Sequence, residues 1–326
     1  MKMRILGKTG IKISEIGVGA WQLGGPLMLD GKADGHPELG RDYCIDLIRK
    51  CGELGINFID TAEQYGNGES ERRVGEALKG QRDKWIVSTK FGNQVSPNGE
   101  RVRNASAERV PISLEGSLRR LQTDYLDVYV YHISPDRNEA EEVARFLDSA
   151  KRKGQVRAVG ISTMKFADID YLHRLGCLDV VQFPQSMLDP QEQIAEFLAR
   201  HQVGGVVRGA FAGGRLSGRY FQIPPKFSAD DVRSTRTSVA GLAEYARCAA
   251  FQELVTSQRG MIQLALRYLL DLPTTHSIIP GGKSVEDYRA AIRATELPPL
   301  TAAEHDRIAQ LRREILSVDA GQKPSR

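Results

Sequence analysis

Short apolar segments alternate with amphipathic segments along most of the chain. Runs rich in β-branched and aromatic residues predict strands, and segments with apolar residues every three or four positions predict helices. The predicted strands are residues 13–20, 57–60, 85–90, 125–132, 156–162, 179–183, 204–209 and 276–281. Helical segments lie between them, among them residues 69–80, 112–122, 138–153, 167–176, 192–202 and 261–271.

This alternation predicts a parallel sheet, because each crossover must carry a helix back across the sheet. Eight such units favour a closed (β/α)8 barrel over an open doubly wound sheet. Residues 4–12 predict a hairpin that turns at residues 8–10, and residues 212–238, rich in Gly, Ser and Arg, predict a long loop. Residues 301–317 predict an additional C-terminal helix that begins with a capping box. We expect residues 1–326 to form a single barrel domain.

Composition narrows the class of protein. The hydrophobic fraction is 41% and the charged fraction 26%, values typical of globular proteins. The 45 basic and 41 acidic residues leave a net charge of +4, too small to indicate binding to nucleic acid or to an anionic membrane. The N-terminus lacks the apolar core of a signal peptide, and no apolar run reaches the length of a membrane helix. We therefore expect a cytoplasmic protein.

The cysteines and histidines give no metal-binding pattern. Four cysteines lie far apart without a CxxC pair, which indicates reduced and mostly buried thiols. The six histidines are scattered, and no metal site is expected. His36, His201 and His305 stand among polar residues, so we expect them at the surface. The sequence leaves the oligomeric state open.

Candidate chemistry gathers where the predicted strands end. The second, third and fourth strands end in Asp60, Lys90 and His132, and Tyr65 lies in the loop after Asp60. In (β/α)8 barrels the carboxyl ends of the strands converge on the reaction site. An ammonium beside a tyrosine hydroxyl makes the phenol more acidic, a carboxylate holds the ammonium in place, and a histidine can orient a carbonyl oxygen. The four side chains together predict a proton donor for a carbonyl that accepts hydride from a nicotinamide.

The same segments resemble the aldo-keto reductases. DTAEQYGNGESERRVGEAL at residues 60–78, the later STK and DYLDVYVYH, and the opening LGKTGIKISEIGVGAWQLGG carry the likeness, which runs from residue 3 to about residue 317. The resemblance implies a catalytic tetrad at Asp60, Tyr65, Lys90 and His132. It also implies a substrate pocket lined by Trp21, with Ile133 at a position where many relatives carry a bulkier aromatic residue.

The resemblance further implies a nicotinamide cofactor. Ser162 and Gln182 match residues that bind the carboxamide, and residues 203–220 resemble the pyrophosphate loop. Arg208 stands where many members have a stacking tyrosine, and Lys283 would meet a 2′-phosphate, aided by the N–H groups of the helix that follows. Asp287 would repel that phosphate if it pointed there, so NADPH is favoured and NADH stays open. The cofactor residues implied are Ser162, Gln182, Arg208, Gly209, Ala210, Phe211, Gly213, Gly281, Lys283 and Asp287.

The favoured function is therefore NADPH-dependent reduction of an aldehyde, a ketone or possibly a sugar, or the reverse oxidation. One alternative is a Schiff-base lyase, because Lys90 ends a barrel strand where an aldolase-type amine could act. Another is a cofactor-sensing regulatory subunit. The sequence does not reveal the substrate or the direction of the reaction.

Overall fold

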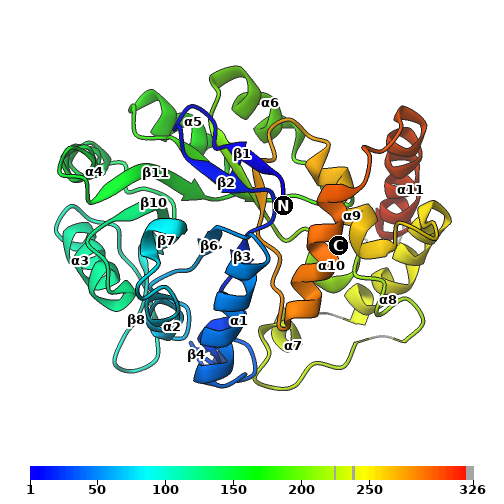
Figure 1. Ribbon diagram of the computed structural model, residues 1–326, viewed down its shortest axis with the longest axis horizontal. Coiled ribbons are helices and arrows are strands. Elements are labelled where there is room, and N and C mark those ends of the chain that lie inside the picture. Colours follow the sequence, from blue (N-terminus) through cyan, green and yellow to red (C-terminus); the bar gives the residue numbers. More distant parts are fainter. Residues whose placement is uncertain (224, 237–238, 321–326) are drawn as a thin grey trace.

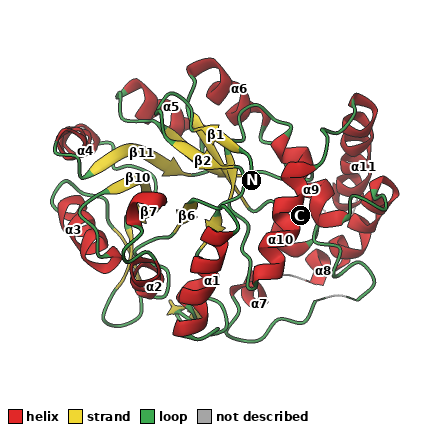
Figure 2. Cartoon of the chain, viewed as in Figure 1, coloured by secondary structure: helices red, strands yellow, loops and turns green. Residues whose placement is uncertain are grey.

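The computed structural model describes residues 1–223, 225–236 and 239–320. In this part of the chain one sheet contains eight strands, and each hydrogen-bonded pair of neighbours runs parallel. In their order across the sheet these are β3 (Val18–Gly19), β6 (Phe58–Asp60), β7 (Ile86–Phe91), β10 (Leu126–Tyr131), β11 (Val156–Ser162), β12 (Val180–Pro184), β13 (Gly204–Arg208) and β14 (Ser277–Ile278). Helices lie around these strands (Figures 1 and 2).

Backbone contacts between the first and last strands close the sheet. Ile16 forms a parallel bridge with Ile278. The Gly17 N–H donates to the carbonyl of Ile278 at 2.8 Å, and the Ile278 N–H donates to the carbonyl of Glu15 at 2.9 Å. The predicted (β/α)8 barrel is thereby confirmed.

Side chains of each barrel strand alternate between the inside of the barrel and the surrounding helices. In β10, Val128 and Val130 join the inner apolar cluster, whereas Tyr129 and Tyr131 pack in the outer core. The inner cluster comprises Leu6, Ile11, Ile13, Phe58, Val128, Val130, Ala158, Val180, Val206 and Ile279. Its first three members come from the N-terminal hairpin, which therefore closes the end of the barrel where the strands begin.

The helices follow the predicted order. They are α1 (Arg41–Glu53), α2 (Glu69–Ala77), α3 (Arg109–Leu121), α4 (Ala140–Arg152), α5 (Phe166–Arg174), α6 (Glu192–His201), α7 (Val232–Arg236), α8 (Val239–Arg247), α9 (Met261–Leu270), α10 (Val285–Glu296) and α11 (Ala302–Ala320). Short 3-10 helices are η1 (Gln22–Gly24), η2 (Arg82–Lys84), η3 (Ala212–Gly214) and η4 (Cys248–Leu254). Among the described residues, no helix combines the length and apolar character needed to cross a bilayer.

Two antiparallel hairpins extend from the end of the barrel where the strands finish. One consists of β4 (Met28–Leu29) and β5 (Lys32–Ala33), after the first barrel strand. The other consists of β8 (Asn93–Val95) and β9 (Arg101–Arg103), after β7. Neither was predicted, because each strand is too short to show a clear alternation of apolar and polar residues.

Two sequence-based boundaries need correction. The predicted strand 13–20 is divided, because Ile13 and Ser14 belong to β2 (Lys12–Ser14), which pairs with β1 (Met3–Ile5). The division falls at the bend at Glu15, where Ser14 and Glu15 interrupt the apolar residues, and the prediction treated this interruption as part of one strand. The predicted loop 212–238 contains η3 and α7, and its residues 224 and 237–238 lie outside the described residues. The C-terminal helix and its Thr301–Glu304 capping contacts are confirmed.

Candidate active site

The strand ends bring the four predicted catalytic side chains together. Asp60 is the last residue of β6, Lys90 lies one residue before the end of β7, and His132 directly follows β10. These three strands are neighbours in the sheet, so their ends meet at one edge. Tyr65 comes from the turn between β6 and α2.

Lys90 is the centre of this group. Its ammonium is fully buried and lies 2.5 Å from Asp60 Oδ2, 2.8 Å from the Thr61 carbonyl oxygen and 3.0 Å from the Tyr65 hydroxyl. Burial alone would lower the pKa of Lys90, but the charges and hydrogen bonds of Asp60 and Tyr65 raise that pKa above its ordinary value. The side chain therefore carries its positive charge at neutral pH, beside the phenol oxygen.

Asp60 links Lys90 to the next strands. Its Oδ1 accepts hydrogen bonds from Ser88 Oγ at 2.9 Å and from Gln182 Nε2 at 2.8 Å. Ser162 Oγ in turn donates to Gln182 Oε1 at 2.9 Å. The two predicted carboxamide-binding residues are thus neighbours in register on β11 and β12, and Gln182 contacts the charged pair directly while Ser162 contacts Gln182.

Aromatic rings surround the Tyr65 hydroxyl. The Trp21 indole stacks on the Tyr65 ring with centroids 5.8 Å apart, and the His132 imidazole meets that ring edge-on at 5.8 Å. Burial lowers the pKa of His132 well below its usual value, and the positive charges of Lys90, Arg208 and Arg101 lower it further. The imidazole is therefore neutral at physiological pH, so it can donate one hydrogen bond without adding charge.

The sequence did not predict a polar cluster beside Trp21. The Trp21 indole N–H donates to the backbone carbonyl of Asp34 at 3.2 Å. The carboxylate of Asp34, which is 5% exposed, pairs with Arg101 at 3.1 Å and accepts from Gln64 Nε2 at 2.5 Å. Arg101 lies on β9, so this cluster joins the two hairpins at the mouth of the barrel. Ile133, the other predicted substrate residue, packs against the outer core near Gly92.

His36 also belongs to this region, contrary to its predicted surface position. Its side chain is 5% exposed and meets the Trp21 ring edge-on at 5.0 Å, while Nδ1 lies 3.7 Å from Asp231. The α7 segment covers it, since the Val232 N–H donates to the Gly35 carbonyl oxygen at 2.9 Å. Its polar sequence neighbours resembled those of a surface residue, but they are covered by a segment almost 200 positions away in the sequence.

The predicted pyrophosphate loop follows β13, which ends at Arg208. Gly209 and Gly213 adopt φ angles of 68° and 71°, a region that residues other than glycine rarely occupy. A Cβ at Gly213 would meet no atom within 4 Å, so the backbone there is open to a close approach. Ala210 is buried and Phe211 packs against the outer core, which anchors the loop. The open backbone turn fits a phosphate-binding role.

The carboxylate of Asp287 is engaged at the start of α10. Its Oδ2 accepts from the N–H groups of Lys283 and Ser284 at 2.9 Å and 3.1 Å, and its Oδ1 accepts from Arg219 at 2.8 Å. Lys283 and Ser284 precede the helix, so these two hydrogen bonds cap α10 and do not engage the N–H groups of its first residues. Gly281 lies under Gln22, whose amide donates to its carbonyl oxygen at 3.2 Å.

Two basic side chains flank this segment. Arg219, which the sequence did not single out, pairs with Asp287 and is 61% exposed at its side chain. Burial lowers the pKa of the Lys283 ammonium, and nearby Arg233 lowers it further. The only sequence signal for Arg219 was the arginine content of the long predicted loop. Lys283 and Arg219 are two described cations at this end of the site, and they fit a cofactor that carries a phosphate.

The Lys90 geometry disfavours the alternative of a Schiff-base lyase. Such an enzyme needs a neutral, accessible amine as nucleophile. Lys90 is buried, charged and hydrogen-bonded to three oxygen atoms, which matches the three donors of an ammonium. The arrangement suits stabilisation of charge on the adjacent phenol oxygen.

Comparisons with known proteins identify the family of the chain. The sequence model described as "Aldo/keto reductase family" matches residues 15–313. The chain is 30% identical over 292 residues to the aldo-keto reductase YhdN of Bacillus subtilis, covering 87% of this chain and 85% of that protein. It is 30% identical over 320 residues to the NADH-specific methylglyoxal reductase of Escherichia coli, covering 91% and 94%. The structure of the aldo-keto reductase AKR11C1 from Bacillus halodurans in its holo form superposes with a TM-score of 0.78 at 29% identity, covering 95% and 96% of the two chains. The chain thus belongs to the aldo/keto reductase family, and it is an NAD(P)H-dependent oxidoreductase.

Proposed function

We propose that the protein reduces a small polar aldehyde or ketone with NADPH, and that Tyr65 is the proton donor. The observation that carries this proposal is the contact of 3.0 Å between the buried Lys90 ammonium and the Tyr65 hydroxyl. NADPH, when bound, supplies the hydride that the side chains of the chain cannot provide.

Each tetrad residue has a distinct task in this mechanism. Tyr65 donates its hydroxyl proton to the carbonyl oxygen of the substrate, and Lys90 stabilises the phenolate that remains. Asp60 fixes Lys90 and keeps it charged. His132, neutral because of its burial, donates a hydrogen bond that orients the carbonyl oxygen. In the reverse direction the same groups would accept the proton of an alcohol.

Ser162 and Gln182 would hold the carboxamide of the nicotinamide, and the open turn at Gly209 and Gly213 would receive the pyrophosphate. Lys283 and Arg219 would meet the 2′-phosphate of NADPH. Since the Escherichia coli relative is named as NADH-specific, the preference must be tested directly. We expect Lys283→Ala to weaken NADPH binding much more than NADH binding, measured by quenching of tryptophan fluorescence. An equal loss for both would mean that the phosphate binds elsewhere.

On the substrate side of the mouth, Trp21 lies beside the charged pair of Asp34 and Arg101. This mixture supports a small carbonyl compound with hydroxyl or further carbonyl groups, including a short sugar. Methylglyoxal and glyceraldehyde are suitable first substrates, and hexanal provides an apolar comparison. We expect kcat/KM to be higher for methylglyoxal and glyceraldehyde than for hexanal.

The decisive experiment for the mechanism replaces Tyr65 by Phe, which removes one oxygen and keeps the ring. Loss of a general acid lowers turnover by about 10²–10⁴-fold. NADPH affinity should be unchanged, because the phenol hydroxyl contacts Lys90 and not the predicted cofactor residues. Tyr125→Phe, a change at a tyrosine that packs against Arg82, is the matched control and should retain activity. Turnover within threefold of wild type in Tyr65→Phe would refute the assignment.

A further inference from the structure

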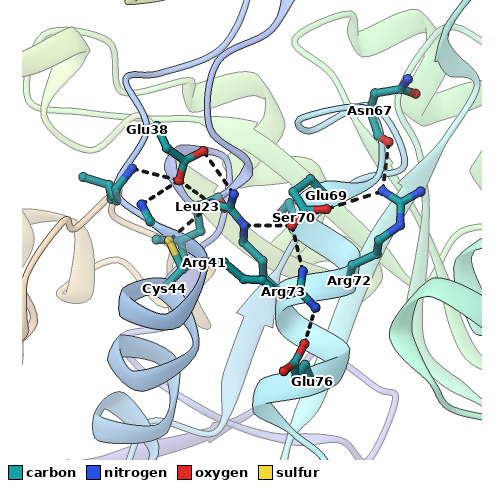
Figure 3. Close-up of polar contacts among 12 residues, drawn as sticks. Leu23, Glu38, Arg41, Cys44, Asn67, Glu69, Ser70, Arg72, Arg73 and Glu76 are labelled. Atoms are coloured by element: carbon teal, nitrogen blue, oxygen red, sulfur yellow. Dashed lines mark hydrogen bonds and ion pairs between the residues drawn. The ribbon is translucent and has the colours of Figure 1, made fainter.

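A buried arginine lies directly behind the turn that carries Tyr65. The Arg73 side chain, on α2, is 7% exposed and contacts η1, the segment before α1, Cys44 of α1 and Glu69 of its own helix (Figure 3). Its Nη1 donates to the Leu23 carbonyl oxygen at 2.9 Å, and its Nε donates to Glu69 Oε1 at 3.1 Å. Both terminal nitrogens bind the carboxylate of Glu38 at 3.0 Å in a bidentate pair. One guanidinium therefore joins η1, the segment before α1 and the first turn of α2.

The η1 turn lies tightly against the backbone of Tyr65. A Cβ placed on Gly24 would lie 2.9 Å from the carbonyl carbon of Tyr65, and one on Gly66 would lie 2.0 Å from the carbonyl oxygen of Gly24. Only glycine at both positions permits this approach. Because η1 directly follows Trp21, the same contact sets the indole against the Tyr65 ring.

The other side of the Tyr65 turn is held by the start of α2. The Ser70 N–H donates to the Tyr65 carbonyl oxygen at 3.2 Å, and Ser70 Oγ donates to the Ala20 carbonyl oxygen at 2.8 Å. Thr61 Oγ1 donates to Ser70 Oγ at 2.8 Å. The turn is thus enclosed between η1 and α2, and Arg73 is the side chain that connects these two elements.

The neighbouring arginine provides a contrast. Arg72 is 49% exposed at its side chain, lies 3.6 Å from Glu69 and bonds the Asn67 carbonyl oxygen at 3.4 Å. It makes exposed contacts within its own turn and helix, whereas Arg73 crosses to the segments before α1. Of the three arginines labelled in Figure 3, Arg41 joins α1 to α2 at the surface through Glu69 and Glu76, Arg73 joins α2 to η1 and to the segment before α1, and Arg72 stays within its own turn and helix.

We infer that Arg73 is a positioning residue for catalysis: by tying η1 to α2 it sets the distance of the Tyr65 hydroxyl from Lys90 and the stacking of Trp21 on Tyr65. This inference rests on the proposed role of Tyr65 as proton donor. A displacement of about 1 Å at a reacting group can cost about 10²-fold in rate. Loss of the Arg73 contacts should therefore lower kcat for carbonyl reduction, and it should raise KM because Trp21 borders the substrate.

The test compares Arg73→Met and Arg73→Lys with Arg72→Met as the matched control, all in a Trp85→Phe background. There Trp21 is the remaining tryptophan, so its emission reports the indole environment in the folded protein. We expect Arg73→Met to lower kcat by about 10- to 100-fold, to raise KM for methylglyoxal and to shift Trp21 emission to longer wavelength, with the NADPH Kd within twofold of the parent. Arg73→Lys should recover part of kcat, and Arg72→Met should match the parent.

A purely structural role predicts a different pattern. The urea midpoint of Arg73→Met would then fall while kcat, KM and Trp21 emission at low urea stayed at parental values, and that result would overturn the inference. If Arg73→Met does not fold, Glu38→Gln, which weakens the bidentate pair, replaces it with the same expectations in milder form. Failure of the proposed function is recognised separately, since it requires Tyr65→Phe to remain active.

Discussion

The buried pair of Lys90 and Asp60 makes it possible to separate catalysis from stability by mutation. Lys90→Met removes the ammonium and keeps a side chain of similar length. The Asp60 carboxylate then stays buried and still accepts hydrogen bonds from Ser88 and Gln182, but it has lost its cation. The reciprocal change, Asp60→Asn, leaves a buried ammonium without its carboxylate. A double variant has neither charge.

The expected magnitudes follow from the burial of both groups. Breaking one side of a buried ion pair costs about 3–5 kcal/mol in the free energy of unfolding. In the double variant, the asparagine oxygen can accept the hydrogen bonds from Ser88 and Gln182. Its amide N–H groups lose a partner, which costs about 1–3 kcal/mol. We therefore expect the double variant to be about 2 kcal/mol more stable than Lys90→Met.

Activity should not follow stability in this series. Without the ammonium beside Tyr65, proton donation loses about 10²–10⁴-fold, and restoring charge balance does not replace the cation. Lys90→Met and the double variant should be equally inactive toward methylglyoxal, although their urea midpoints differ. Lys84→Met, at an exposed lysine before the same strand, is the control and should change neither property.

The measurements are made near pH 7.5, where Lys90 is charged. Folding raises the pKa of Lys90 above its ordinary 10.5, so the stabilisation is complete below that value and is lost only as pH rises through the folded pKa. Urea denaturation gives the stabilities and NADPH oxidation gives the rates. Recovery of activity in the double variant, or a Lys90→Met enzyme as fast as wild type, would refute the assigned role of Lys90.

Two further predictions concern the mouth of the barrel. Gly66→Ala places a Cβ 2.0 Å from the Gly24 carbonyl oxygen at a φ of 57°, so it should lower both the stability and kcat. The control is Gly80→Ala, at a φ of 78° with no atom near the new Cβ, which should lower the free energy of unfolding by only about 1–2 kcal/mol and leave kcat unchanged. Equal effects on kcat would contradict the tight Tyr65 turn. Burial lowers the pKa of His36 from 6.5 to about 4, so the unfolded chain takes up the proton first as pH falls and the fold should lose about 2 kcal/mol between pH 7.5 and pH 5 through this residue. The urea midpoint of His36→Gln should fall less over that interval than the midpoint of wild type. His132 contributes to the fall in both proteins, so it does not affect the difference between them. Equal falls of the two midpoints would show that His36 does not cause the loss of stability.

The barrel and its tetrad were predictable because both depend on regular, local patterns. Each strand is an apolar run of its own, and a parallel sheet places all strand ends on one side, so residues at those ends meet without any knowledge of loop paths. Asp60, Lys90 and His132 therefore met as expected. The division of the strand at residues 13–20 escaped prediction because the two polar residues at the division, Ser14 and Glu15, do not show that the pairing changes there from the hairpin to the barrel.

The polar residues around the mouth of the barrel could not be predicted from such patterns. Arg73 has the appearance of a solvated helix residue, and its next neighbour Arg72 is one. The Arg73 guanidinium is buried because it contacts residues far away in the sequence, among them Glu38 and the Leu23 carbonyl. Asp34 and Arg101 likewise meet 67 positions apart on two hairpins too short to leave a pattern. A buried charge requires a partner, and in each case here the partner lies on another loop at the carboxyl ends of the strands. The regular pattern of strands predicts where the reaction site lies, but it does not predict which loop residues form these ion pairs. Replacing Arg73 by Met, with Arg72 as the matched control, therefore tests whether such loop-to-loop pairs determine how well the tetrad works.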